Sequence, residues 1–213
     1  MKERPIPPAA QEVKVLPKPY YEDVKSGITI YNGDCREILP HISADTLITD
    51  PVWPNATLLL PGSDRPEALF GEAWGAANGF KRAAIQIGCW TPPFFLSCID
   101  LRFFRHAWLD IARVGYRGRL MVTGDVAYLF GEPPVSRVGH RVIPGRMIDS
   151  SCDGKQTDHP CPRKIGHVRW LVNWWSDLDD IICDPFMGGG TTARAAKDHN
   201  RKFVGIEIEE RFC

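Results

Sequence analysis

The sequence has no excess of charge of either sign, no long apolar run and no paired-cysteine pattern. Its 26 Lys and Arg residues balance 26 Asp and Glu residues, so no overall field attracts nucleic acid. No apolar run approaches the roughly 18 to 20 residues of a membrane-spanning helix. The seven cysteines are odd in number and irregularly spaced, without a signal peptide, which fits a reducing compartment. We therefore expect a cytoplasmic protein that does not span a membrane.

A zinc centre is the metal site that the residues most readily suggest. Cys152, His159 and Cys161 lie near one another in the sequence. No CxxC pair accompanies them, however, and such a pair is typical of structural zinc sites. We therefore expect no metal.

The 213 residues suit one α/β domain with a substantial core. Residues 1–27 begin with a proline-rich stretch that has no periodic apolar face, so we expect an N-terminal arm followed by a single domain over 28–213. Between residues 102 and 169, twelve Lys or Arg residues stand against six Asp or Glu residues. This excess permits a basic face for phosphates, and a scattered solvated surface is the alternative.

The segment 181–207 carries the strongest local pattern. A short apolar run at 181–183 predicts a buried strand, and the proline and three glycines within 185–190 must end it in a tight loop. Thr191 and Thr192 are placed to cap the helix that follows. A glycine loop at a helix N-terminus lets a ligand approach backbone N–H groups, so the pattern predicts a nucleotide-type cradle.

An acid follows the next predicted strand, at 203–206. Glu207 stands where a carboxylate can accept hydrogen bonds from both ribose hydroxyls of a bound nucleotide. Only six residues follow Glu207, so the strands that complete a doubly wound sheet must come from upstream sequence. This order predicts a circularly permuted α/β fold with a mostly parallel sheet. An ordinary glycine loop with a surface acid is the alternative.

A second acid lies at the end of an upstream strand. Residues 28–31 predict the first strand, and Asp34 is placed to cap a short helix over 35–39. Residues 44–49 predict the next strand, which ends at the tetrapeptide Asp50-Pro51-Val52-Trp53. Because α/β enzymes bind substrates at the carboxyl ends of parallel strands, Asp50 is a candidate catalytic residue.

Apolar periodicity predicts the remaining elements. They are an irregular region with a short helix over 54–78, a strand over 83–88, a helix over 101–113, a strand over 118–125 and a helix over 165–175. The stretch 131–158 is rich in arginine, proline and glycine, and a hairpin is expected within it.

Three motifs resemble those of the permuted, β-group DNA amino-methyltransferases, which modify adenine N6 or cytosine N4. Residues 184–192, DPFMGGGTT, are similar to the family's motif for S-adenosyl-L-methionine (AdoMet); residues 50–53, DPVW, to its catalytic tetrapeptide; and residues 159–163, HPCPR, to its helix entry. The motifs keep the family's order. The resemblance implies a Rossmann-like AdoMet-dependent methyltransferase fold over 28–213, acting in DNA methylation or restriction–modification in a bacterium or phage.

The resemblance also implies roles for individual residues. The implied catalytic residues are Asp50, Pro51 and Trp53. The implied AdoMet contacts are Asp34, His159, Asp184, Phe186, Gly188, Gly190, Thr191 and Glu207. The implied nucleic-acid contacts, in a short target-recognition segment at about 131–158, are Arg137, His140, Arg141, Arg146 and Lys155. Double-stranded DNA with an extruded base is the implied partner, and a homodimer is one possible assembly.

The expected chemistry activates a poor nucleophile, because the lone pair of an exocyclic amine is delocalised into its ring. The Asp50 carboxylate and the Pro51 carbonyl would accept the two amine hydrogens, and Trp53 would stack on the extruded base. In this family, Asp at the first position of the tetrapeptide favours adenine N6. Cytosine N4, and adenine N6 in RNA, are the near alternatives.

The chain departs from the family pattern at Val52 and Lys164, where the family has proline, and at Cys213, after which the family's next helix would follow. Both acceptors survive the change at Val52, so activity is expected. A catalytically silent subunit that binds AdoMet or nucleic acid is an alternative. An NAD-dependent dehydrogenase is another, although it does not explain the tetrapeptide at 50–53. A shortened chain or support from a partner would account for the ending at Cys213.

Overall fold

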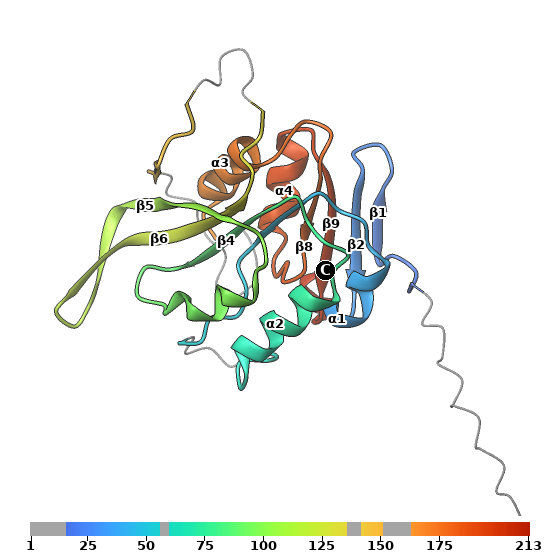
Figure 1. Cartoon of the computed structure of the whole chain (residues 1–213), viewed down its shortest axis with the longest axis horizontal. Coiled ribbons are helices and arrows are strands. Elements are labelled where there is room, and N and C mark those ends of the chain that lie inside the picture. The colour runs from blue at the N-terminus through green and yellow to red at the C-terminus, as the bar shows by residue number, and fades with distance from the viewer. Residues whose placement is uncertain (1–15, 56–59, 136–141, 151–162) are drawn as a thin grey trace, which may run out of the picture.

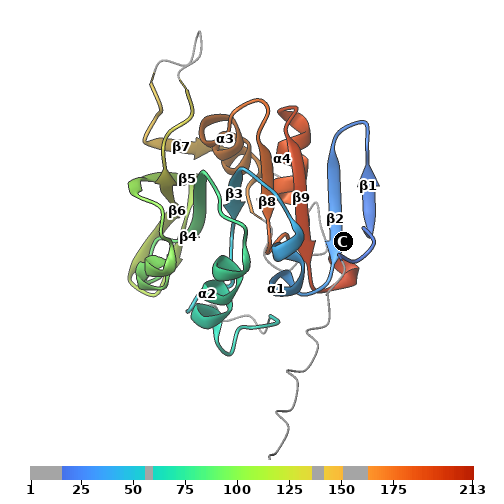
Figure 2. The same cartoon turned by 45° about the vertical axis from the view of Figure 1, so that its right-hand side comes forward.

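The computed structural model describes residues 16–55, 60–135, 142–150 and 163–213. These residues form one nine-stranded sheet with the order β1-β2-β9-β8-β3-β4-β6-β5-β7 (Figure 2). The strands are β1 (Tyr21–Asp23), β2 (Ile28–Asn32), β3 (Thr46–Thr49), β4 (Arg82–Gly88), β5 (Phe103–Arg117), β6 (Leu120–Gly131), β7 (Arg146–Asp149), β8 (Ile181–Asp184) and β9 (Lys202–Glu207). The helices are α1 (Cys35–Ile38), α2 (Pro66–Ala76), α3 (Ile165–Trp175) and α4 (Thr191–Asp198), with 3-10 helices at Leu39–His41, Pro93–Cys98 and Glu210–Phe212.

The centre of the sheet is parallel. Strands β2, β9, β8, β3 and β4 run in one direction, whereas β1 joins β2, and β6 joins β4 and β5, in antiparallel pairs. The predicted α/β architecture with a mostly parallel sheet is confirmed. The sheet begins before residue 28, because Tyr21–Asp23 of the expected arm forms its edge strand.

Helices cover both faces of the sheet, as a doubly wound fold requires (Figure 1). One core lies beneath α3 and α4 and contains Ile48, whereas the other lies beneath α1 and α2 and contains Leu47. Successive residues of one strand enter different cores because their side chains alternate across the sheet. All four residues of β3 are buried for this reason.

Helix α3 has the predicted bounds and presents an apolar face to the sheet. Val168, Leu171, Val172 and Trp175, at three- and four-residue intervals, are buried. The Trp175 indole donates to the Ala83 carbonyl at 3.0 Å. This contact ties the end of the helix to β4.

The prediction of a helix over 101–113 is wrong, because this segment forms most of β5. The apolar residues fit helical spacing, but burial alternates: Ala107 and Leu109 are fully buried, while Trp108 between them is 41 % exposed. Pairing with β6 on one side and β7 on the other overrides the local pattern. The strand expected at 118–125 is the first part of β6.

Strands β5 and β6 form a hairpin that extends beyond the parallel strands (Figure 1). Gly88, at the carboxyl end of β4, pairs with Asp125, so residues 120–124 of β6 run past that end together with their partners on β5. Gly118 turns the hairpin with a positive φ of 60°. Tyr116, Leu120 and Met121 are exposed near the turn. The hairpin therefore projects from the edge of the sheet where ligands bind.

Helix α4 begins at Thr191, two residues before the Ala193 start that caps at Thr191 and Thr192 imply. The predicted caps, Thr191 and Thr192, lie inside its first turn, and Gly190 occupies the N-cap with φ of 74°. This left-handed conformation suits glycine, and it lets the backbone turn directly from the loop into the helix. The Asp34 cap is confirmed, since its carboxylate accepts from the Arg36 N–H at 2.9 Å.

Candidate active site

The predicted catalytic and cofactor segments lie side by side. Strands β3 and β8 are parallel neighbours in the sheet, so the loops that follow them leave the same edge. The Thr49 hydroxyl, at the end of β3, donates to Asp184 Oδ1, at the end of β8, at 2.6 Å. This bond joins residues that are 135 positions apart.

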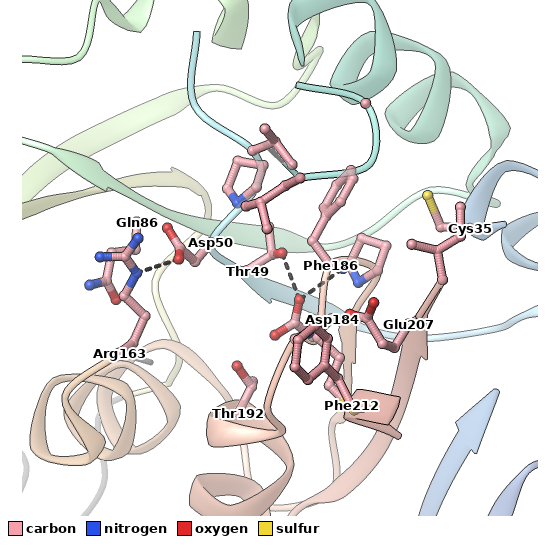
Figure 3. A pocket seen from close by; sticks show the side chains of 18 of the residues that line it. Cys35, Thr49, Asp50, Gln86, Arg163, Asp184, Phe186, Thr192, Glu207 and Phe212 are labelled. Carbon is pink, nitrogen blue, oxygen red and sulfur yellow. Dashed lines mark hydrogen bonds and ion pairs between the residues drawn. The ribbon is translucent and has the colours of Figure 1, made fainter. Parts of the chain in front are cut away.

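A cavity of about 290 Å³ lies at this edge, and both loops line it (Figure 3). Of the residues assigned from the sequence, it is lined by Asp34, Asp50, Pro51, Trp53, Asp184, Phe186, Gly188, Thr191 and Glu207. Gly190 is not among the lining residues and acts as the cap of α4. The predicted contact residues His159, Arg137, His140, Arg141 and Lys155 lie outside the described residues. Arg146 lies apart from the cavity, on β7, where it pairs with Asp110 at 2.8 Å.

Glu207 holds the glycine loop against the end of β9. One oxygen of its carboxylate accepts from the Gly188 N–H and the other from the Glu209 N–H, each at 2.8 Å. A carboxylate can accept about four hydrogen bonds, so acceptor capacity remains beside the cavity. The two hydroxyl groups of a ribose can donate hydrogen bonds to this remaining acceptor capacity. The residues present therefore fit the nucleoside part of AdoMet, with Gly188 at a positive φ of 53° bringing the loop backbone close.

Asp184 anchors the start of the same loop. Its Oδ1 accepts from the Thr49 hydroxyl and from the Phe186 N–H at 3.1 Å. Burial raises the pKa of its carboxyl to about 6, against the lowering effect of hydrogen bonds from Thr192, Thr49 and the Phe186 backbone. The nearby charge of Asp50 raises it further. The carboxylate is thus committed to holding the two loops together.

Asp34 is engaged by its neighbour. The Arg36 guanidinium donates to both Asp34 oxygens, at 2.9 and 2.5 Å, and also to Glu72 at 2.6 Å. The side chain caps α1 and lines the cavity at once, so capping and contact with a ligand are compatible. Its contact with AdoMet stays a prediction.

Asp50 is bound by a donor at each oxygen. Trp53 Nε1 donates to Oδ1 at 2.8 Å, and the Arg163 guanidinium donates to Oδ2 in an ion pair. Burial raises the pKa of the Asp50 carboxyl to about 6. The positive charge and hydrogen bond of Arg163 lower it, and the charge of Asp125 raises it. Asp50 therefore titrates close to neutral pH.

Sequence reasoning assigned no site role to three polar residues around Asp50. Arg163 lies 3.4 Å from Asp125, and Asp125 accepts from Gln86 Nε2 at 2.8 Å. Figure 3 shows Arg163 and Gln86 beside Asp50. Gln86 interrupts the apolar run 83–87 of β4, and Asp125 directly precedes the mostly apolar run 126–130 of β6, which was the available signal. Arg163 ends the HPCPR motif, but its contact with Asp50 needs the fold.

The described part of the chain holds neither a candidate metal centre nor a candidate membrane-spanning helix. Within it, no group of three or more His, Cys, Asp or Glu residues could hold a metal ion. None of the helices in these same ranges is long and apolar enough to cross a membrane. Cys152, His159 and Cys161 lie outside the described residues.

Comparisons with known proteins identify a family by sequence and a shared fold by structure. Residues 80–213 match the family model for DNA methylases of the N6/N4 group. The orphan methyltransferase M.BamHII of Bacillus amyloliquefaciens is 41 % identical over 73 residues, which cover 33 % of this chain and 27 % of that protein. The crystal structure of an M1.HpyAVI–SAM complex superposes with a TM-score of 0.69 at 21 % identity, covering 87 % of this chain and 95 % of that one. The structure of the cytosine-N4-specific PvuII DNA methyltransferase superposes with a TM-score of 0.64 at 12 % identity, covering 87 % of this chain and 83 % of that one.

Proposed function

Because the chain belongs to the DNA methylase family of N6-adenine and N4-cytosine enzymes, we propose that it transfers the methyl group of AdoMet to the exocyclic amine of a base in DNA. One observation carries the proposal: the Asp50 carboxylate and the Gly188 loop line the same cavity. A nucleoside on that loop and an amine at Asp50 would meet within one site. A generic dinucleotide cradle explains the loop but not Asp50, Pro51 and Trp53.

The residues of this chain would bind and orient both reactants. AdoMet, when bound, supplies an electrophilic methyl group. Glu207 would hold its ribose through hydrogen bonds, and the Gly188 loop would let AdoMet approach backbone N–H groups. The Asp50 carboxylate and the Pro51 carbonyl would accept the two amine hydrogens, which localises the nitrogen lone pair. Methyl transfer leaves one excess proton on that nitrogen. Asp50, with a pKa of about 6, can accept it and pass it to solvent.

We propose adenine N6 as the methylated position. The support is the Asp at the first position of the tetrapeptide, which favours adenine in this family. Cytosine N4 is the alternative, because a cytosine-N4-specific enzyme shares the fold. Mass spectrometry of nucleosides after reaction with unmethylated DNA separates N6-methyladenine from N4-methylcytosine. A product that contains only the cytosine derivative would refute the assignment.

Double-stranded DNA is the proposed substrate. The hairpin of β5 and β6 projects from the catalytic edge, and between Asp110 and Asp125 its sequence contains three arginines and no acid. A two-stranded ribbon of this kind fits the major groove. The predicted contacts at Arg137, His140, Arg141, Arg146 and Lys155 stay part of the proposal. Parallel reactions with duplex DNA, single-stranded DNA and RNA test the choice.

A labelled-methyl assay tests the activity itself. Wild-type protein should transfer tritium from AdoMet to unmethylated genomic DNA, and Asp50→Ala should abolish the transfer. Wild-type protein that is folded, binds AdoMet and transfers nothing to DNA or RNA would refute the enzymatic proposal. It would favour a silent subunit, suggested by Val52, and activity gained by Val52→Pro would support that alternative. Sedimentation tests the proposed homodimer.

A further inference from the structure

We propose that Arg163 occupies the place of the target base in the DNA-free protein and leaves it when the base enters. The inference rests on the proposed function, because it concerns how that reaction's site is kept before DNA binds. Arg163 is the residue before Lys164, the N-cap of α3, and helix α3 is fixed on the sheet through Trp175. Its guanidinium therefore stands at Asp50 as a consequence of the fold.

The guanidinium makes the two contacts that the reaction requires of a base. Its Cζ atom lies 4.3 Å from the centroid of the Trp53 ring, which is a stacking distance. Its Nε–H donates to Asp50 Oδ2. A target base would likewise stack its plane on Trp53 and donate an amine hydrogen to Asp50. A planar, delocalised group with N–H donors is the side chain that best imitates such a base.

Arg163 and the base cannot use these contacts together. Each Asp50 oxygen already accepts one hydrogen bond, and the guanidinium that donates to Oδ2 also covers a face of the Trp53 ring, so a base stacked on that face would collide with it. Trp53 has little room to turn away, because its six-membered ring packs against Gly88, where a Cβ would lie 2.8 Å from Cζ3. Entry of the base therefore requires displacement of Arg163 from its position over the ring.

The resting contact also keeps Asp50 ready for the reaction. Three charged groups face Asp50: Arg163 ahead of α3, Asp125 on β6 and Asp184 at the end of β8. Asp125 opposes the ionised form of Asp50, Asp50 and Asp184 repel each other when both are ionised, and Arg163 is the cation that supports ionised Asp50. Arg163 is thus a positioning residue, since it acts through Asp50 and need not touch the reacting atoms.

Steady-state methyl transfer by Arg163→Ala tests the proposal. Without the competing group, the KM for unmethylated genomic DNA should fall by roughly two- to thirtyfold, the range spanned by cation–π contacts. The acid limb of the kcat/KM profile, which reports the DNA-free enzyme, should move to higher pH, because the cation that favours ionised Asp50 is gone. An unchanged or raised KM, or a kcat lowered equally at every pH, would overturn the proposal.

Arg163→Lys separates charge from shape. Lysine keeps the positive charge but lacks the planar fork, so the acid limb should stay near its wild-type position while the KM still falls. An Arg163→Lys variant with the same KM and the same acid limb as Arg163→Ala would contradict the proposal. Arg169→Ala is the matched control on α3, because Arg169 pairs with Asp198 away from the cavity, and it should change neither quantity.

A measurement without DNA or AdoMet distinguishes this proposal from the proposed function. The fluorescence contribution of Trp53 is the difference between a protein and its Trp53→Phe variant, with folding checked by circular dichroism. Acrylamide should quench that contribution more strongly in Arg163→Ala than in wild type. Equal quenching would overturn the placement of Arg163 over Trp53, whatever the activity. Absence of methyl transfer by wild type would instead refute the enzymatic proposal.

Discussion

The hydrogen bond from Thr49 to Asp184 is expected to hold the two site loops together, and Thr49→Val tests this. The change replaces the hydroxyl with a methyl group of similar size. Both residues are buried, since Thr49 is 3 % exposed and Asp184 is 2 % exposed. A hydrogen bond to a charged group contributes about 1.5–3 kcal/mol, so the free energy of unfolding should fall by about that amount when Asp184 is ionised.

The loss of stability caused by Thr49→Val should be larger at higher pH. The pKa of Asp184 is raised to about 6 in the folded protein, so ionisation of this group destabilises the fold as pH rises through that value. The hydrogen bond from Thr49 lowers the pKa of Asp184, so loss of this donor should raise that pKa further. The difference between wild type and variant should therefore be largest above about pH 7 and smaller near pH 4.5, where the carboxyl is protonated in both.

Urea unfolding at pH 8 and at pH 4.5, with equal slopes checked, measures the two differences. Thr29→Val is the matched control, because it changes the same atoms on β2, away from Asp184. A Thr49→Val protein as stable as wild type at pH 8, or one that loses equal stability at both pH values, would refute the reasoning.

Three other predictions concern the same edge of the sheet. Glu207→Gln should weaken AdoMet binding, measured by calorimetry, by roughly tenfold or more, since a charged acceptor is lost at Gly188; unchanged affinity would show that Glu207 does not hold the ribose. Gly205→Ala should lower the urea midpoint, because its Cβ would lie 2.5 Å from Met187 Sδ, with a cost of about 1–3 kcal/mol; an unshifted midpoint contradicts this packing. Methyl transfer should decline as pH falls through about 6, where Asp50 becomes protonated and loses acceptor capacity. A rate that does not change down to pH 5 would exclude Asp50 as the acceptor.

The sequence alone predicted the elements whose local pattern and tertiary role agree. Helix α3 and strands β4 and β8 have strong apolar periodicity and are packed on both sides or along one face, so local preference and burial point the same way. The resemblance of residues 50–53 and 184–192 to two motifs of one family also predicted that Asp50 and Asp184 share a site, and the pairing of β3 with β8 agrees with it.

The parts that were missed depend on partners distant in sequence. Residues 103–113 have an apolar pattern compatible with a helix, and only pairing with β6 and β7 decides for a strand. Arg163 meets Asp50 across 113 positions, so no local signal reveals the contact. The cap at Gly190 depends on a left-handed backbone angle that glycine permits but does not require.

The order of strands in the sheet has a consequence for how the protein is made. Strands β8 and β9 are synthesised after the seven other strands of the described sheet, yet they lie between β2 and β3, which are among the earliest. A nascent chain that has not reached β8 therefore exposes two unpaired strand edges where the middle of the sheet should be. We expect such intermediates to depend on chaperones, and the cofactor cradle to form in the same late step that closes the sheet.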